Sequence, residues 1–266
     1  MTDKRKLASM MAGRTLEEFY MKDSVPGIEV CLEVKGLSKK GVFNDINFDL
    51  KKGEILGISG MVGSGRSELA KAIFGIELAD SGEIIIAGEE LPLKHSPKDS
   101  LNAGLVLVPE NKEESLILNN SVSINTKIGI LETFIKFIYL NKNKEERILL
   151  KRTNKLDIHT SNTEQKMFDF FEENQQEIVI AKYLETNPLI LILDEPTKGM
   201  DINIKSDIYN IVNNLAKSGA SIIIISSELP EIINMSDRVA IMKEGHIVNI
   251  LEGDEINQEK IMSFAV

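Results

Sequence analysis

Short, uninterrupted apolar runs alternate along this chain with stretches in which apolar residues recur at helical spacing. Continuous apolar runs are typical of strands in a parallel sheet, because helices cover both faces of such a sheet. The predicted strands are residues 28–34, 54–59, 83–88, 105–109, 189–193 and 221–226. The predicted helices are residues 67–75, 202–219 and 229–236. The alternation predicts an α/β domain with a mostly parallel sheet, whose ligands bind at the carboxyl ends of the strands.

Three other segments depart from this alternation. Residues 5–20 have the spacing of a short helix, and the globular part is expected to begin near Gly27, after the breaker DSVPG. Residues 114–163 carry helical spacing without strands and predict a helical insertion. Residues 238–251 predict a closing hairpin, because the dipeptide Glu-Gly at its centre suits a tight reversal.

Composition excludes several classes of protein. The 266 residues include 31 Lys and Arg against 41 Asp and Glu, and this net charge of −10 disfavours nucleic acid as a partner. One cysteine cannot form an internal disulfide, and three scattered histidines give no metal-ligand spacing. No apolar run approaches the roughly 20 residues of a membrane-spanning helix, and no signal peptide is recognisable. We expect a protein of a reducing compartment.

The first candidate site is a glycine-rich loop between a predicted strand and a predicted helix. Its sequence, GMVGSGRS, runs from Gly60 to Ser67. In a phosphate-binding loop of the form G-x-x-x-x-G-K-[ST], backbone N–H groups and the helix N-terminus cradle phosphate, and the hydroxyl binds Mg²⁺. Gly60, Gly65 and Ser67 match this form, but Arg66 stands at the lysine position. Arginine keeps the charge and can bind phosphate bidentately, but its planar head is bulkier than an ammonium group. A glycine turn that packs strand against helix is the alternative interpretation.

The second candidate site follows the apolar run LILIL. Asp194 and Glu195 come directly after this predicted strand, at the end where α/β sheets bind ligands. In this hypothesis Asp194 holds Mg²⁺, and Glu195 orients and polarises the water that attacks a phosphoryl group. The alternative is a pair of acidic residues that merely end the strand.

These residues, together with PTKGMD and the strand ending SSELPEI, resemble the ATP-binding subunits of ATP-binding cassette (ABC) transporters. The resemblance extends over residues 27–252 and is closest to the carboxyl-terminal half of the double cassettes that energise bacterial ribose, galactose and xylose importers. It implies a P-loop NTPase core, an antiparallel β subdomain and a helical subdomain at about 114–186 within a domain of residues 27–266. Residues 1–26 are similar to the linker between the two halves.

The resemblance also implies roles for single residues. Gly60, Gly63, Ser64, Gly65, Arg66 and Ser67 would bind the phosphates of ATP in the Walker A loop. Ser67 and Asp194 would hold Mg²⁺, Glu195 would be the catalytic base, and Asp201 would be the D-loop aspartate. Glu110 stands where most cassettes have the Q-loop glutamine, and Ser227 where most have the switch histidine.

The segment FFEENQQ resembles a degenerate form of the signature motif LSGGNQQ. In the family, this motif contacts the γ-phosphate of ATP that is bound to the opposite cassette. Here Phe171 replaces the serine, and Glu172 and Glu173 replace both glycines. Two like charges about 4 Å apart cost on the order of 4 kcal/mol at an effective dielectric constant of 20, so the motif is predicted to be disabled. The alternative is a solvated turn whose glutamates repel nothing.

The expected function is that of an ATP-binding subunit that couples ATP hydrolysis to monosaccharide import. Its implied partners are a second cassette, transmembrane permease subunits and, indirectly, a periplasmic or lipoprotein sugar-binding protein. Its implied location is cytoplasmic, on the inner face of the membrane. A catalytically impaired or scaffolding subunit is the alternative, and a stand-alone P-loop kinase is disfavoured because LDEPTKGMD is typical of cassettes. Phe43 is expected to pack in the core, and no chemistry is assigned to His95, His159 or His246.

Overall fold

The computed structural model describes residues 20, 22–111, 120, 125, 166–169, 175 and 188–266, apart from the side chain of Asn203. The chain divides into two compact units, one of residues 1–107 and 189–266 and the other of residues 108–188. The helix expected within residues 5–20 and nearly all of the helical segment expected at 114–186 lie outside the described residues. The second unit contains one short described helix, η2 (Met167–Asp169).

The first unit contains a six-stranded sheet of order β10-β9-β3-β8-β7-β6. Its strands are β3 (Ile55–Gly60), β6 (Leu105–Val108), β7 (Ile190–Asp194), β8 (Ser221–Ile225), β9 (Arg238–Lys243) and β10 (His246–Glu252). The pairs β3–β8, β7–β8 and β3–β9 are parallel, and only the hairpin β9–β10 is antiparallel among the pairs with a described register. This confirms the expected mostly parallel sheet.

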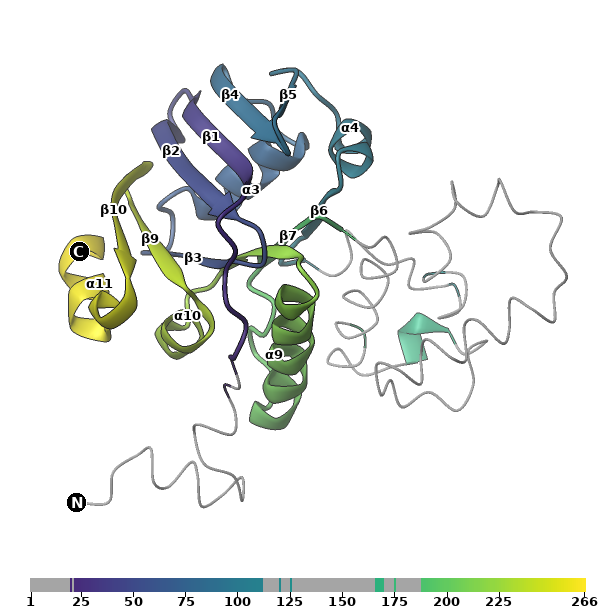
Figure 1. Ribbon diagram of the computed structural model, residues 1–266, viewed down its shortest axis with the longest axis vertical. Helices are drawn as coiled ribbons and strands as arrows, with labels where there is room; N and C mark the ends of the chain where they lie inside the picture. The colour runs from purple at the N-terminus through teal and green to yellow at the C-terminus, as the bar shows by residue number, and fades with distance from the viewer. Residues whose placement is uncertain are drawn as a thin grey trace, which may run out of the picture. The chain divides into compact units, whose positions relative to one another are not determined.

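A second, antiparallel sheet has the order β2-β1-β4-β5. Its strands are β1 (Val30–Lys39), β2 (Phe43–Lys51), β4 (Ser81–Ile86) and β5 (Glu89–Leu91). The antiparallel subdomain implied by the resemblance is therefore present. Figure 1 shows these four strands together, with the strands of the parallel sheet below them in that view.

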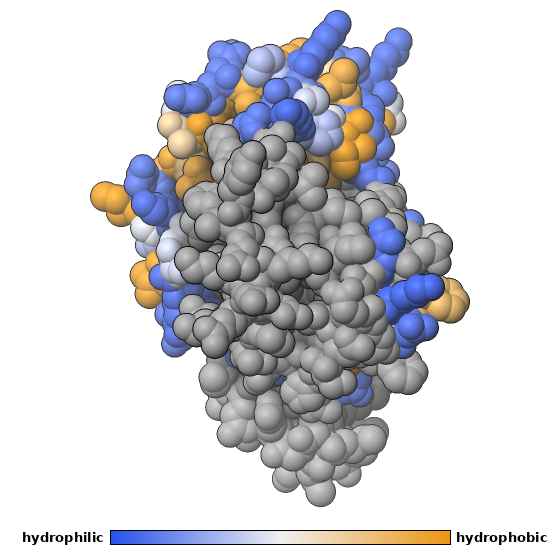
Figure 2. Space-filling model, turned by 90° about the vertical axis from the view of Figure 1, so that its right-hand side faces the viewer, coloured by the Kyte–Doolittle hydropathy of each residue, from blue (hydrophilic) through white to orange (hydrophobic). Residues whose placement is uncertain are grey.

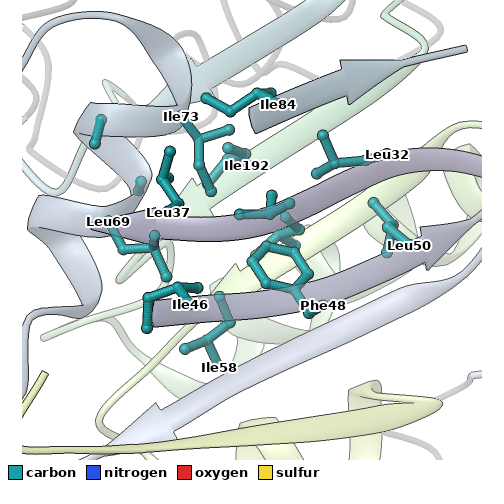
Figure 3. Packing of buried hydrophobic residues seen from close by; sticks show 14 of the residues in the cluster. Leu32, Leu37, Ile46, Phe48, Leu50, Ile58, Leu69, Ile73, Ile84 and Ile192 are labelled. Atoms are coloured by element: carbon teal, nitrogen blue, oxygen red, sulfur yellow. The ribbon is translucent and has the colours of Figure 1, made fainter. Parts of the chain in front are cut away.

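The hydrophobic core lies between the two sheets and the helix α3 (Arg66–Phe74). Figure 3 shows Leu69 and Ile73 of α3 beside strand residues such as Leu37 and Ile46 of the antiparallel sheet and Ile192 of β7. Phe43 is 3% exposed and belongs to this core, as expected. The core holds α3 against both sheets, and it thereby fixes the position of the glycine loop that leads into this helix.

Four further helices are described in this unit: α4 (Pro97–Asn102), α9 (Ile202–Lys217), α10 (Leu229–Met235) and α11 (Gln258–Ala265), with the short η3 (Gly253–Glu255). None of the described helices is long and apolar enough to cross a membrane. Exposed side chains near α3 and α4 include the apolar Ile76, Leu78 and Leu101. Figure 2 shows hydrophilic and hydrophobic residues mixed over the described surface near the top of that view.

Candidate functional site

The carboxyl ends of three neighbouring strands meet at one edge of the parallel sheet. Strand β8 lies between β3 and β7, and its last residue, Ile225, is paired with Ile58 of β3 and Asp194 of β7. The glycine loop follows β3, the two acidic residues end β7, and Ser226 and Ser227 follow β8. The fold therefore brings the two candidate sites together, as the sequence predicted from strand polarity.

The loop from Gly60 to Ser67 depends on glycine at two close approaches. A Cβ atom on Gly60 would lie 2.3 Å from the carbonyl oxygen of Met242, so only glycine fits there. Gly65 has φ = 97°, which is left-handed and favours glycine, and a Cβ atom would lie 3.1 Å from the carbonyl oxygen of Val42. The loop is thereby packed against β9 and against the turn between β1 and β2.

Several polar groups of this loop have no hydrogen-bond partner among the described residues. No described backbone carbonyl accepts a hydrogen bond from the N–H of Gly63 or Gly65, and Leu69 N–H is the first in α3 to bond back, to Gly65 O at 2.9 Å. The Ser64 hydroxyl is buried and has no hydrogen-bond partner among the described residues. Unpaired donors at a helix N-terminus attract anions, because the helix dipole adds positive charge there.

Arg66 points into the protein, toward the ends of β7 and β8. Its side chain is 8% exposed, its Nη1 donates to Ser226 O at 2.8 Å, and its Nη2 lies 3.9 Å from Glu195 Oε1. A buried guanidinium needs such partners, because an unpaired buried charge is costly. The cation of the loop is thus paired with the candidate base.

Glu195 has an unusual backbone conformation. Its φ of 48° lies in the left-handed region, which costs a non-glycine residue energy and often marks a functional position. The Glu195 N–H donates to Ile225 O at 2.8 Å, and the carboxylate accepts from Ser227 Oγ at 3.0 Å. Together with Arg66, these bonds fix both the backbone and the carboxylate.

Ser67 and Asp194 also form a pair. Ser67 Oγ, at the start of α3, donates to Asp194 Oδ1 at 3.1 Å, and Asp194 is 2% exposed. These are the oxygen donors that Mg²⁺ prefers. Among the described residues, no group of three or more His, Cys, Asp or Glu side chains could hold a metal ion. The ion would therefore need oxygens from its ligand or from water as well, as Mg²⁺ usually does.

A buried hydrogen-bond network behind this site was not predicted from the sequence. Thr197, two residues after Glu195, donates from Oγ1 to Glu231 Oε1 at 3.0 Å and lies 3.4 Å from the Tyr209 hydroxyl. Burial raises the pKa of Glu231 to about 7. The helical spacing of Glu231, Ile232 and Met235, all buried, was the available signal that Glu231 faces inward on α10.

A pocket of about 700 Å³ lies next to the glycine loop. Its walls are formed by residues 38–44 at the β1–β2 turn, by Gly63 and Asp80, and by residues 244–246 at the β9–β10 turn. The volume is within the range of about 300–1,000 Å³ that is typical of small-molecule sites. A ligand whose phosphates lie in the loop would have room for its remainder here.

The remaining predicted positions are Asp201, Glu110 and the three residues of the signature motif. Asp201 is exposed and directly precedes α9, where its carbonyl accepts from Lys205 N at 3.0 Å. Glu110 is exposed and belongs to the second unit. Phe171, Glu172 and Glu173 lie outside the described residues.

Curated relatives match this chain over nearly its whole length. It is 40% identical over 265 residues to the ribose import ATP-binding protein RbsA of Oceanobacillus iheyensis, covering 99% of this chain and 53% of the relative. It is 41% identical to a putative ribose/galactose/methyl galactoside import ATP-binding protein of Rhizobium etli, covering 98% of this chain and 50% of that protein. The chain thus spans about half the length of these curated relatives.

Solved structures agree with the fold. The structure of cbiO1 from Clostridium perfringens, part of the ABC transporter complex cbiONQ, superposes with a TM-score of 0.73 at 24% identity. The match covers 88% of this chain and 93% of that one. The family model described as ABC transporter matches residues 43–198, which is more than half of this chain. The chain therefore belongs to the ABC transporter family.

Proposed function

We propose that this chain is the Mg-ATP-binding cassette of an importer for monosaccharides such as ribose or galactose. One observation carries the proposal: the glycine loop, the Ser67–Asp194 pair and Glu195 converge where β3, β7 and β8 end. The names of the relatives support the transported substrate class.

The loop supplies the contacts to the phosphates of ATP. The N–H groups of Gly63 and Gly65, which have no hydrogen-bond acceptor among the described residues, face the anion with those of the first turn of α3. Gly60 lets the loop pass close to β9. Ser64 adds a buried hydroxyl that has no partner among the described residues. Arg66 adds a cation once it turns from Glu195 to phosphate. The nucleoside extends into the pocket between the two turns.

Ser67 and Asp194 fit a magnesium ion. Two ligands at adjacent corners of an octahedron with Mg–O distances of about 2.1 Å lie about 3.0 Å apart. The two side-chain oxygens lie 3.1 Å apart. When bound, the ion neutralises phosphate charge and leaves the chain's own residues to position the water.

Glu195 is the proposed base for hydrolysis. Its carboxylate accepts a hydrogen bond from Ser227 and pairs with Arg66, so both of its oxygens have partners before nucleotide binds. Arg66 must leave Glu195 to reach phosphate, which frees one oxygen for water. Ser227 then holds the other oxygen, which makes it the positioning residue at the switch position.

A complete transporter would contain further subunits. The chain spans about half the length of its curated relatives, so a protein of their length would have room for a second cassette. The proposed partners are that cassette, the permease and, indirectly, a sugar-binding protein, with this chain on the cytoplasmic face of the membrane. The D-loop role of Asp201 and the Q-loop role of Glu110 belong to the same proposal.

A second candidate function is a nucleotide-binding or scaffolding subunit that hydrolyses little or no ATP. Two observations favour it: Arg66 is paired with the proposed base, and the signature position carries glutamates in place of glycines. A nucleotide-binding subunit would share ATP binding with the first candidate and differ from it in turnover, whereas a scaffolding subunit need not bind ATP.

The decisive experiment is a calorimetric titration of the chain with ATP, with and without Mg²⁺. We expect saturable binding that depends on Mg²⁺ and is lost in Asp194→Asn. The matched control is Asp207→Asn, since Asp207 is an exposed aspartate on α9. Failure of the folded chain to bind millimolar ATP would contradict the proposal and leave scaffolding as the leading function.

A further inference from the structure

We propose that His246 is the residue against which the nucleobase stacks, held in place by Asn44. The inference rests on the proposed nucleotide-binding function and concerns how the pocket recognises its ligand. It also goes beyond the sequence, which gave His246 no role.

The position of His246 is fixed relative to the phosphate-binding loop. The β9–β10 turn donates from Gly245 N to Ser64 O at 3.1 Å, and its Gly245 O accepts from Asn44 N at 2.8 Å. A Cβ atom on Gly245 would lie 2.5 Å from Val42 O, so glycine allows this approach. The turn therefore joins the glycine loop to the β1–β2 turn, and His246 is the next residue.

Among the described residues that line the pocket, His246 carries the exposed ring. The pocket walls include two residues with rings, Phe43 and His246. Phe43 is 3% exposed because its side chain packs in the core. His246 is exposed and lines the pocket. Within the described residues, a base that enters the pocket can therefore stack on one flat π surface, the ring of His246.

Hydrogen bonds engage both nitrogens on the edge of the His246 ring, so a ligand would contact the face of the ring. His246 Nδ1 lies 3.0 Å from Glu244 O, which can only accept, so Nδ1 carries the proton and donates. His246 Nε2 lies 3.4 Å from Asn44 Nδ2, which can only donate, so Nε2 accepts. Both ring nitrogens are engaged, and the orientation of the imidazole is set in advance.

Stacking of the nucleobase on the face of the His246 ring determines how strictly the pocket selects among bases. Every base offers a π face, so stacking tolerates different bases, whereas hydrogen bonds to base edges discriminate among them. The pocket is therefore expected to take purine nucleoside triphosphates as a class, with ATP and GTP binding within about fivefold of each other.

The test compares calorimetric titrations with Mg-ATP, Mg-GTP and Mg-tripolyphosphate, which has no base. We expect His246→Ala to lower the affinity for both nucleotides by about fivefold or more, because stacking contributes roughly 1–3 kcal/mol per base. The affinity for tripolyphosphate should be unchanged. His246→Phe keeps a flat ring and should retain nucleotide affinity. Asn44→Ala frees the ring and should weaken the nucleotides less than His246→Ala does. Val248→Ala, at an exposed position of β10 outside the pocket walls, is the matched control.

The outcomes separate this inference from the proposed function. If the unchanged chain binds tripolyphosphate and ATP equally, or if His246→Ala weakens all three ligands alike or none of them, the stacking role is wrong while phosphate binding stands. Loss of nucleotide affinity in His246→Phe would also overturn it, because the edge would then matter. If the unchanged chain binds none of the three ligands, the proposed function itself fails.

Discussion

Glu231 is a carboxyl group that folding removes from water. It is 1% exposed, and burial raises its pKa to about 7, with hydrogen bonds from Ser226 and Thr197 opposing the rise. A raised pKa means that the folded state favours the protonated form. The stability that this group contributes is therefore fully present below its ordinary pKa of 4.5 and is lost as the pH rises to about 7.

Glu231→Gln should remove this pH dependence. The amide keeps an oxygen that can accept from Thr197, and it has no charge to desolvate. We expect the variant to exceed the unchanged chain in free energy of unfolding by about 1–3 kcal/mol at pH 8 and to match it near pH 4.5. Urea unfolding at several pH values measures this. Glu89→Gln, at an exposed position, is the control, and parallel curves for the two variants would contradict the assignment.

The residues of the candidate site could be picked out from the sequence, but their hydrogen-bond partners could not. Glycines at fixed spacing and acidic residues after an apolar run are local patterns, so Gly60, Ser67 and Asp194 were found from the sequence alone. The bond from Arg66 to Ser226 and the bonds of His246 join segments that are far apart in the chain. No local pattern reports such contacts, and they become visible only when the strand order is known.

At the scale of elements, the segment that precedes β1 is bound to α9 through Asn213. Asn213 Oδ1 accepts from the N–H groups of Asp23 and Ser24 at 3.1 Å each, and its Nδ2 donates to Asp23 Oδ1 at 2.6 Å. Tyr20 stacks on Tyr209 of the same helix with ring centroids 5.0 Å apart. These contacts connect the segment to the helix that carries part of the Thr197–Glu231 network.

Asn213→Ala should detach this segment from α9. The backbone N–H groups of Asp23 and Ser24 would lose their acceptor. The bond to Ser24 is buried, and an unsatisfied buried group costs roughly 1–3 kcal/mol. We expect faster amide hydrogen exchange at residues 22–26 with little change in β3, β7 and β8. Asn214→Ala, at the exposed neighbouring position, is the matched control. Equal exchange in the two variants would show that the segment is held by other contacts.

The accuracy of the element predictions depended on how regular each pattern is. Buried strands such as β7 and β8 have continuous apolar runs, and the structure places them within one or two residues of the prediction. Strand β2 was not predicted because its alternation of apolar and polar residues is interrupted. The interruption lies at Asp45, which has φ = 50°, and there the pairing with β1 shifts register between Leu37 and Lys39. Helix α11 was also missed, although Asn257 caps it by accepting from Lys260 N at 2.9 Å.

At the scale of the whole molecule, the central question is whether this chain can form the sandwich of two cassettes that the family uses. By resemblance, each nucleotide in such a sandwich lies between the loop of one cassette and the signature motif of the other. In a pair of identical copies of this chain, both nucleotides would face Glu172 and Glu173. Carboxylates beside a γ-phosphate repel it, and they replace the glycine N–H groups that would otherwise approach it closely.

Restoring the signature should therefore allow self-association. We expect the triple variant Phe171→Ser, Glu172→Gly, Glu173→Gly to dimerise with Mg-ATP roughly a thousandfold more tightly than the unchanged chain, since about 4 kcal/mol of repulsion is removed. Sedimentation velocity over a range of protein concentrations measures the dimerisation constant. The double variant Glu172→Gln, Glu173→Gln removes the charge but restores no glycine, so its intermediate affinity would separate repulsion from backbone access. If all three chains sediment alike in Mg-ATP, the glutamates do not oppose the sandwich, and the impaired-subunit candidate loses its main support from the sequence.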